Sequence, residues 1–285
     1  MAVTSWTTAG SGQNSTALAS GTYSWSSPGR ITANDNSDTI AGTEAGGGAA
    51  TNGATDALRA YNFGFSIPSS AQIDDVEVRY ERWFDDGGSG TGVAAQERTI
   101  RLSKNGTTYV GDNKSDSSTY ESTRTLAVRG GDSDGWNASL SPADVNATSF
   151  SVGIEANIGG GGFVISNGKI DYVQMRIYYA TAPADPTNIS SSQINDQIKI
   201  TWTDNATDED NYEIQRNIDG GGWVSLSSSL AANTESYTDS PPLNDSSIQY
   251  RVRATKTGGA TSSFDTASAF NYTPHTGRGS PISYY

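Results

Sequence analysis

Three short segments decide the fold of this chain: Ile198-Lys-Ile-Thr-Trp202, Tyr212-Glu-Ile-Gln-Arg216 and Ile248-Gln-Tyr-Arg-Val-Arg-Ala254. In each of them bulky apolar residues alternate with polar ones, which is the pattern of a β-strand with one buried and one solvent-facing side. The strand-like segments of this part of the chain are spread over about 90 residues, close to the ~100 residues of an immunoglobulin-type sandwich. The C-terminal part therefore predicts a β-sandwich.

The same alternation marks the N-terminal part of the chain. It appears in the runs Val76 to Tyr80, Phe150 to Ile158 and Val173 to Tyr179, and Gly- and Asp-rich turns separate these runs. Asn105-Gly106 is a hairpin signal. No window repeats apolar residues at helical spacing over three turns, and Ser141 to Asn146 predicts a single helical turn. The predicted fold class is all-β, with two tandem β-sandwiches.

The boundary between the two predicted domains lies in Ala180-Thr-Ala-Pro-Ala-Asp-Pro186, where two prolines stiffen a short connector. We expect an N-terminal domain over residues 1–182, a second domain over 183–274 and an unpatterned tail over 275–285. Residues 1–55 are rich in Gly, Ser and Thr, and they predict an arm that buries little apolar area of its own. We expect its aromatic residues to attach it at a few points, to its own domain or to a neighbouring subunit: Trp6, Tyr23 and Trp25.

Composition and charge argue against several classes of function. The 285 residues carry a net charge of −13, which is the wrong sign for a nucleic-acid-binding surface rich in Lys and Arg. There is no cysteine, so the fold uses neither disulfides nor thiolate metal sites. No run approaches the ~18 apolar residues of a membrane span, and the N-terminus lacks the basic and apolar regions of a signal peptide. We expect a protein made in a cytoplasm that neither binds nucleic acid nor inserts into a membrane.

Four residues of the C-terminal part occupy telling places in the strand pattern. Trp202 comes late in the predicted second strand, Tyr212 opens the third, and Leu243 precedes Tyr250 in the sixth. In these positions the segment from Pro183 to Pro274 resembles a fibronectin type III domain. The resemblance implies a sandwich whose core contains these four side chains. It also implies a tyrosine corner at Tyr250, in which the hydroxyl bonds back to upstream backbone.

Five segments of the N-terminal part are each a predicted strand or corner and contain no catalytic motif: Phe63-Gly-Phe-Ser-Ile-Pro68, Ile73-Asp-Asp-Val-Glu-Val78, Leu140-Ser-Pro-Ala-Asp-Val145, Phe150-Ser-Val-Gly-Ile154 and Ile170-Asp-Tyr-Val-Gln-Met-Arg-Ile-Tyr-Tyr179. In these segments the chain resembles β-sandwich modules of structural proteins from tailed bacteriophages. The resemblance implies a jelly-roll-like topology. Virion proteins often append immunoglobulin-like or fibronectin-like modules, so both resemblances indicate the same class of protein.

Acidic residues supply the candidates for a metal site. Asp132 and Asp134 are calcium candidates because closely spaced carboxylates suit a hard cation. The segment lacks the long loop and distal Glu of an EF-hand, and a turn in which Asp side chains cap backbone amides accounts for the same residues. The acidic run over 204–210 indicates a solvated loop. The single histidine, His275, lies in the tail, which argues against His-based catalysis and zinc sites. We predict no metal, no cofactor and no catalytic residue.

Aromatic residues supply the candidates for a glycan site, because exposed rings stack on the faces of sugars. Trp136 and Trp223 are the candidate glycan contacts, and Trp83 and Phe84 belong to the same group. Trp223 follows Gly220-Gly-Gly222 and is expected to be the most exposed of them. The alternative is core packing, since large aromatic side chains dominate the cores of sandwiches.

These observations lead us to expect a non-enzymatic bacteriophage virion structural protein, of the capsid-decoration, head-fibre or tail-appendage type. We expect it to attach to capsid or tail proteins through its N-terminal domain and to display the fibronectin-like domain. We also expect homo-oligomers, with a trimer as the first expectation, and weak multivalent contact with host surface glycans. Two alternatives stay open: a carbohydrate-binding cell-surface or secreted adhesion protein, and a polysaccharide-degrading enzyme.

Overall fold

The computed structural model describes residues 2–42, 53–85, 95–132, 134–159, 167–242, 244, 246–256 and 260–274. The chain is all-β and consists of two tandem β-sandwiches, a jelly-roll-like one followed by a fibronectin type III-like one. They form two compact units, Met1–Ala180 (unit 1) and Thr181–Tyr285 (unit 2), which divide within the proline-containing connector. Among the described residues, no helix has the length and the hydropathy needed to cross a membrane.

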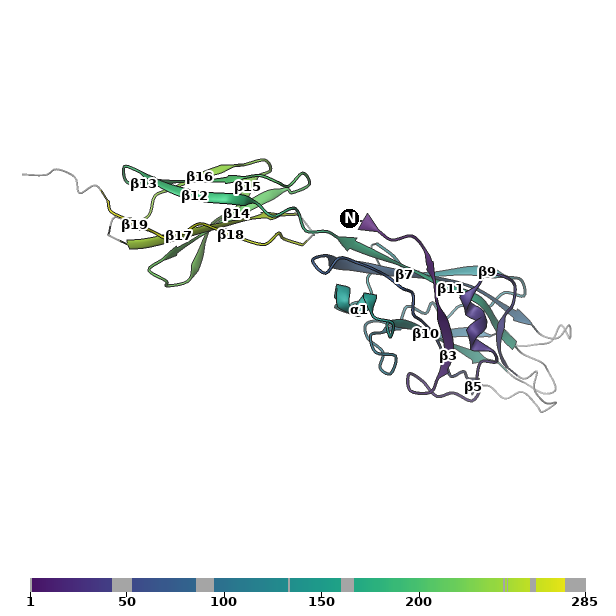
Figure 1. Ribbon diagram of the computed structural model, residues 1–285. Coiled ribbons are helices and arrows are strands. Elements are labelled where there is room, and N and C mark those ends of the chain that lie inside the picture. The colour runs from purple at the N-terminus through teal and green to yellow at the C-terminus, as the bar shows by residue number, and fades with distance from the viewer. Residues whose placement is uncertain are drawn as a thin grey trace, which may run out of the picture. The chain divides into compact units, whose positions relative to one another are not determined.

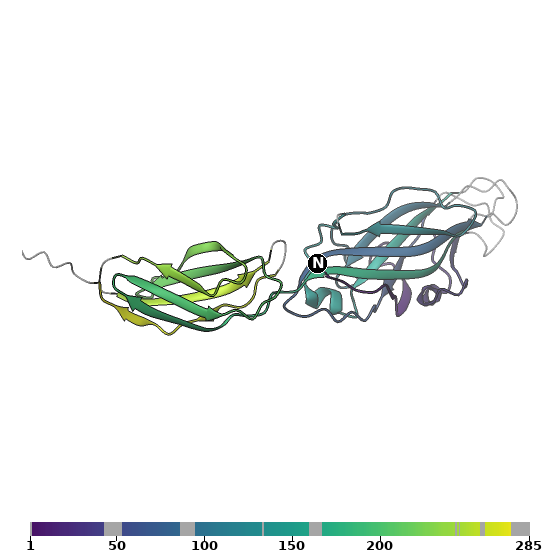
Figure 2. The same ribbon diagram turned by 90° about the horizontal axis from the view of Figure 1, so that it is seen from above.

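The first sheet of unit 1 is built on two long antiparallel strands, β7 (Gln72–Asp85) and β11 (Asn167–Ala180). β9 (Thr125–Gly130) pairs with the other side of β7 and forms the edge of the sheet. Figure 2 shows β11, β7 and β9 side by side in this order. Three short strands pair with the free side of β11: β1 (Ala2–Val3), β2 (Thr7–Thr8) and β4 (Thr39–Gly42).

The second sheet of unit 1 centres on β10 (Ser151–Ile158). β6 (Ala57–Tyr61) and the short β5 (Gly53–Ala54) pair along one side of β10, and β8 (Gln96–Ser103) pairs along the other. β3 (Ser11–Ser15) extends the sheet beyond β6. Bridges from Gln96 to Thr119 and from Leu102 to Val110 lay segment 110–119 along the outer side of β8.

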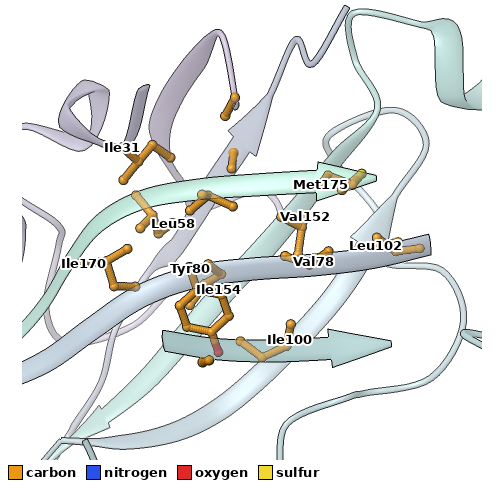
Figure 3. Packing of buried hydrophobic residues seen from close by; sticks show 14 of the residues in the cluster. Ile31, Leu58, Val78, Tyr80, Ile100, Leu102, Val152, Ile154, Ile170 and Met175 are labelled. Atoms are coloured by element: carbon orange, nitrogen blue, oxygen red, sulfur yellow. The ribbon is translucent and has the colours of Figure 1, made fainter. Parts of the chain in front are cut away.

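The core of unit 1 lies between these two sheets, where the inward halves of the alternating strands meet. Figure 3 shows side chains from both sheets packed together: Val78, Tyr80, Ile170 and Met175 from the first, and Leu58, Ile100, Leu102, Val152 and Ile154 from the second. The 3-10 helix η1 (Pro28–Thr32) contacts both β3 and β11, and its Ile31 is fully buried. It therefore closes one side of the sandwich.

Residues 2–42 do not form the arm that their composition predicts. They supply β1 to β4 and η1, and Trp25 is 1% exposed, with its Nε1 donating to the Asp56 carbonyl at 3.0 Å. The Asn14 amide holds the Trp25 backbone from both sides, donating to its carbonyl at 2.7 Å and accepting from its N–H at 2.8 Å. The prediction was wrong because strands join a sheet edge through backbone hydrogen bonds, which need few apolar side chains.

Unit 2 has two antiparallel sheets (Figure 1). One consists of β12 (Thr187–Ile194), β13 (Gln197–Thr203) and β16 (Ser236–Asp239). The other is built on β14 (Asn211–Ile218) and β17 (Ser246–Thr255), with β15 (Trp223–Ala231) beside β14 and the short β18 (Asp265–Thr266) and β19 (Phe270–Tyr272) beside β17.

The residues that carry the fibronectin resemblance lie in the core of unit 2. Trp202 is 4% exposed, Tyr212 and Tyr250 are fully buried, and the rings of Trp202 and Tyr212 lie 5.6 Å apart. Leu243 lies outside the described residues. The Tyr250 hydroxyl donates to the Asp239 carboxylate at 2.7 Å, not to backbone as in a tyrosine corner. A carboxylate on β16 thus takes the place of the upstream carbonyl.

Candidate functional site

Trp136, one of the two candidate glycan contacts, is a core residue. It is 2% exposed, and its Nε1 donates to the Val76 carbonyl at 2.7 Å. Gly130 lies directly against the indole, where an added Cβ would come within 2.3 Å of the Nε1 atom. A ring enclosed in this way has no free face for a sugar, so the candidate glycan contact at Trp136 was wrong, and the other interpretation of these aromatic residues, core packing, is confirmed there.

Trp223, the other candidate, is half-buried at the start of β15. The Arg251 guanidinium lies 4.2 Å from the centre of its ring and 4.0 Å from the ring of Phe264. The Gln215 side-chain oxygen fixes this guanidinium, accepting from its Nε at 2.9 Å and its Nη2 at 2.6 Å. The protein's own arginine therefore covers one face of Trp223 by a cation–π contact.

The rings of Trp83 and Phe84, at the end of β7, are also covered by other parts of the protein. Phe84 is 8% exposed. The Lys169 ammonium lies 4.4 Å from the centre of the Trp83 ring and bonds to Asp85 at 2.6 Å, and the Arg124 guanidinium lies 5.5 Å from the same ring. Both cations pack against Trp83, so this pair stabilises unit 1.

The calcium candidates Asp132 and Asp134 are both exposed. Asp134 bonds to the Lys114 ammonium at 2.6 Å. Within the part of the chain that the structure describes, no three His, Cys, Asp or Glu side chains come close enough together to hold a metal ion. A cation would have to displace Lys114 and find ligands beyond these two carboxylates, since calcium takes 6–8 oxygen ligands.

The acidic residues in the run over 204–210 bond to different parts of unit 2. Asp204 accepts from the Tyr212 hydroxyl and from the Ala206 N–H. Glu209 is 7% exposed and accepts from the Asn233 N–H at 2.9 Å. The exposed Asp208 pairs with Lys256 at 2.6 Å. The prediction of a fully solvated loop was therefore wrong for Glu209, because its carboxylate turns inward to bond the backbone of a neighbouring turn.

A pocket of about 240 Å³ opens beside the start of β7 and is a candidate binding site among the described residues. Ile73, Asp74 and Asp75 of β7 line one wall, and the segment Gly135 to Leu140 lines the other. All of these residues belong to unit 1. Asn137 and Ser139 hold φ angles of 51° and 44°, a left-handed conformation that costs free energy in non-glycine residues. Strained backbone of this kind is frequent at binding sites.

The chemistry of the pocket is set by its two neighbouring carboxyl groups. Asp75 is 7% exposed, and its Oδ1 accepts from the adjacent Val76 N–H at 2.7 Å. The Oδ2 of Asp74 is buried and has no hydrogen-bond partner among the described residues. Burial raises the pKa of both carboxyl groups. The Lys114 charge opposes the shift in the pKa of Asp75, whereas Asp134 and Asp132 add to it.

Two poorly solvated carboxylates next to apolar side chains suit an organic cation. An ammonium or guanidinium group would give the Asp74 Oδ2 the partner that it lacks, through a charge-assisted hydrogen bond. Ile73 and Leu140 would contact the alkyl chain attached to that group. The pocket therefore has the features of a site for a basic side chain.

A buried ionic cluster around Glu97 of β8 escaped the sequence reasoning. Glu97 is 1% exposed and accepts from the Tyr80 hydroxyl and from Arg82, both on β7. Arg129 of β9 adds two bonds of 2.8 Å. Burial and the neighbouring carboxylate hold the pKa of Tyr80 well above its usual value. Arg129 also pairs with Asp116 at 2.8 Å, so two carboxylates match the two guanidinium groups. The cluster thus joins the two sheets through paired charges.

The sequence did contain a signal for this cluster. Tyr80 and Arg82 lie two residues apart on β7, so they face the same side of the sheet. Arg82 therefore continues the inward row of Val78 and Tyr80, where a charge needs a buried partner. Asp74 and Asp75 gave no such signal, because the wall that buries them lies 60 or more residues later in the chain.

Comparisons with known proteins identify no family. No family model matches the chain, and no curated protein matches it. Among solved structures, a Fn3-like protein from Clostridium thermocellum is 22% identical over 31% of this chain and 94% of its own, with a TM-score of 0.25. The pectate lyase PelI from Erwinia chrysanthemi is 17% identical over 28% of this chain, with a TM-score of 0.23. A β-1,2-glucanase from Parabacteroides distasonis is 14% identical over 83% of this chain, with a TM-score of 0.27.

The chain spans 26% of that pectate lyase and 32% of that glucanase. At these identities and TM-scores the likenesses say nothing about activity, substrate or partner. The candidate function has to be argued from the residues of this chain.

Proposed function

We propose that this chain is a non-enzymatic structural protein of a tailed-bacteriophage virion, a capsid decoration, head fibre or tail appendage. Unit 1 attaches it to capsid or tail proteins, and the fibronectin-like unit 2 is displayed. The observation that carries the proposal is how the segments resembling phage sandwich modules are used. Phe63, Phe65 and Ile67 are buried, and the Asn146 side chain brackets Ile67, accepting from its N–H and donating to its carbonyl, both at 2.8 Å.

The use of charged and aromatic side chains also supports a scaffold. Carboxylates in both units bind the protein's own cations, as in the pairs of Arg124 with Asp38 at 2.9 Å and of Arg216 with Asp239 at 2.7 Å. Arginines cover aromatic rings on both units, as Arg79 does at Trp6, 4.2 Å from the ring centre. Side chains committed in this way hold a surface in one shape, which suits a protein that is built into a particle.

The pocket at Asp74 and Asp75 gives unit 1 a place to attach. Under this proposal it takes a lysine or arginine side chain from a capsid or tail protein, because Asp75 and the Oδ2 atom of Asp74 are buried and that oxygen has no hydrogen-bond partner among the described residues. An acidic pocket filled by a basic side chain is also a specific contact, since either charge is costly to bury alone.

Mass spectrometry of purified phage particles, produced by the phage whose genome encodes this chain, tests the proposal. The expected result is a fixed copy number per particle, in the virion and not in the soluble fraction of the lysate. Asp74→Asn together with Asp75→Asn should lower the copy number, whereas Asp208→Asn, which changes an exposed carboxylate of unit 2, should not. Absence of the chain from particles, or depolymerisation of a host polysaccharide by the purified chain, would overturn the proposal.

Contact with host glycans is a second candidate, favoured by Trp223. Arg251 covers one face of its ring by a cation–π contact, but the side chain is only half-buried, so part of the indole stays accessible to a sugar. A glycan array probed with the full chain tests this role. Binding that is lost in Trp223→Ala and kept in Val224→Ala, its 60%-exposed neighbour, would support it. Equal binding by both variants would rule out Trp223 as the contact.

A further inference from the structure

β9 is the edge strand of the first sheet of unit 1, and among the residues that the structure describes it is paired on one side alone. Its partner is β7, over Glu77 to Arg82, with no break in the register. It is the last strand in the order β1-β11-β7-β9, and Figure 2 shows it at the outer side of β7. The other side of β9 therefore presents main-chain groups to its surroundings.

The register shows which groups these are. Gly131 donates to the Val76 carbonyl at 3.2 Å, so the odd-numbered residues of β9 are the ones that bond to β7 in this antiparallel ladder. The N–H and C=O groups of Leu126 and Val128 consequently point away from β7. Among the described residues they have one hydrogen-bond contact, from the Arg129 Nη1 to the Val128 carbonyl at 2.7 Å.

The side chains along this edge are apolar and exposed. Leu126 is 49% exposed and Val128 is 40% exposed, while Ala127 between them turns into the core. The two exposed residues lie two apart, so they form a continuous apolar strip on the outer face. An exposed, regular and apolar edge is a template for pairing with another strand.

The other long edges of the described sheets are protected in ways that β9 is not. β12 and β15 of unit 2 contain register shifts, which twist an edge away from a new partner. β8 is covered by segment 110–119. β9 has no register shift, no proline and no lysine. Its one charged side chain, Arg129, bonds the buried Glu97 and reaches only one outward group of the edge, the Val128 carbonyl.

We propose that β9 pairs with β9 of a second copy of this chain, antiparallel, about a two-fold axis at Ala127. Leu126 then lies opposite Val128 of the second copy, and the outward N–H and C=O groups of both residues bond across the interface. The symmetry repeats this pair, so the outward N–H groups of both residues and the Leu126 carbonyl gain a partner, and the Val128 carbonyl accepts a second bond beside the one from Arg129. The first sheets of the two copies become one continuous sheet.

A second copy fits this edge because the sequence of β9 is complementary to itself. In the two-fold register, Thr125 lies opposite Arg129 of the second copy, and Arg124 lies opposite Gly130 of the second copy. No two like charges face each other, which would destabilise the pair. Two-fold symmetry is also the commonest symmetry among homo-oligomers. The inference does not depend on the virion role, and it proposes a dimer where the sequence led us to expect a trimer.

Sedimentation equilibrium of the full chain tests the interface. The expected result is a reversible monomer–dimer equilibrium, in which Leu126→Lys or Val128→Lys weakens association by about tenfold or more, because each change occurs twice in the interface. Val224→Lys is the matched control, since it adds the same charge at a 60%-exposed valine on β15 and should leave the equilibrium unchanged. A chain that stays monomeric, forms trimers, or dissociates equally with Val224→Lys overturns the proposal.

A single cysteine tests the register without disturbing the apolar strip. Ala127 faces Ala127 of the second copy in a non-hydrogen-bonded pair, where Cα atoms lie roughly 4.5 Å apart, within the ~4.4–6.8 Å that a disulfide spans. The chain has no cysteine, so Ala127→Cys oxidised with copper phenanthroline should form a covalent dimer at a concentration where the chain associates. Val224→Cys should not. A dimer that does not cross-link at Ala127→Cys rules out this pairing.

Discussion

Asp239 joins the two sheets of unit 2, and we expect Asp239→Ala to cost about 3 kcal/mol of the stability of that unit. The carboxylate lies on β16 and is 6% exposed. Its two oxygens accept from the Arg216 Nη1 at 3.0 and 2.7 Å, and one of them also accepts from the Tyr250 hydroxyl at 2.7 Å. Arg216 and Tyr250 belong to β14 and β17, so the alanine variant loses bonds that cross the sandwich.

The magnitude follows from what the substitution leaves behind. Removing one partner of a buried ion pair costs roughly 3–5 kcal/mol, because the other charge is left without compensation. The Arg216 side chain is 16% exposed, so it recovers part of its hydration and the lower end of that range applies. Asp208→Ala is the matched control: it removes the carboxylate of a pair with Lys256 whose side chains are 43% and 26% exposed, and it should cost about 0.5 kcal/mol.

Native-state hydrogen exchange of the full chain, read by mass spectrometry on peptides from β14 and β17, measures the opening of unit 2. A loss of about 3 kcal/mol corresponds to exchange faster by about a hundredfold or more. Combining Asp239→Leu with Arg216→Met should recover part of that loss, because neither charge is then left unpaired although the buried Tyr250 hydroxyl still lacks its acceptor. If Asp239→Ala accelerates exchange no more than Asp208→Ala does, the bonds from Asp239 to Arg216 and Tyr250 do not stabilise unit 2 and the reasoning fails.

Three further predictions concern unit 1. Asp144→Ala removes the acceptor that caps the Ser141 N–H at 2.9 Å and should cost about 1 kcal/mol in urea unfolding at neutral pH. Burial alone would raise the pKa of Asp144, but the Ser141 and Lys104 bonds lower it, so the cost should shrink as the pH falls through that lowered pKa. Burial raises the pKa of Asp75 in the folded protein, so the stability that its protonated carboxyl group contributes at low pH is lost as the pH rises through that pKa. Asp75→Asn carries no such charge. The variant should therefore be more stable than the wild type at neutral pH and should lose this advantage in acid. Trp136→Ala should lower the thermal midpoint, with a loss of roughly 3–5 kcal/mol, and a variant of wild-type stability would contradict its burial.

The features that sequence alone predicted are those written in local periodicity. The alternation at Val76 to Tyr80 and at Ile198 to Trp202 predicted strands, and both segments are strands with their apolar side chains buried. Ser141 to Asn146 predicted one helical turn, and α1 (Pro142–Asn146) has the Ser141 cap. Such signals are readable because the residues that decide them lie within a few positions of each other.

The features that sequence missed depend on contacts between distant segments. Trp136 follows a polar Gly- and Asp-rich turn, which indicates exposure, but its partner Val76 comes 60 residues earlier. The Tyr250 hydroxyl donates to the Asp239 carboxylate and not to a backbone carbonyl, and the alternation of residues along a strand does not reveal that choice of acceptor. The pocket at Asp74 depends on a wall from another segment in the same way.

β11 ends at Ala180, where the connector to unit 2 begins. Its main-chain ladder with β7 extends from Asn167 to Ala180, and the hydrogen bonds of an antiparallel ladder lie perpendicular to the strands. A tensile load applied at residue 180 along the strand axis therefore shears many of these bonds at once, and does not unzip them one after another. The last strand of unit 1 thus anchors it to the connector, and the sheet resists a force along this strand through the combined strength of the ladder.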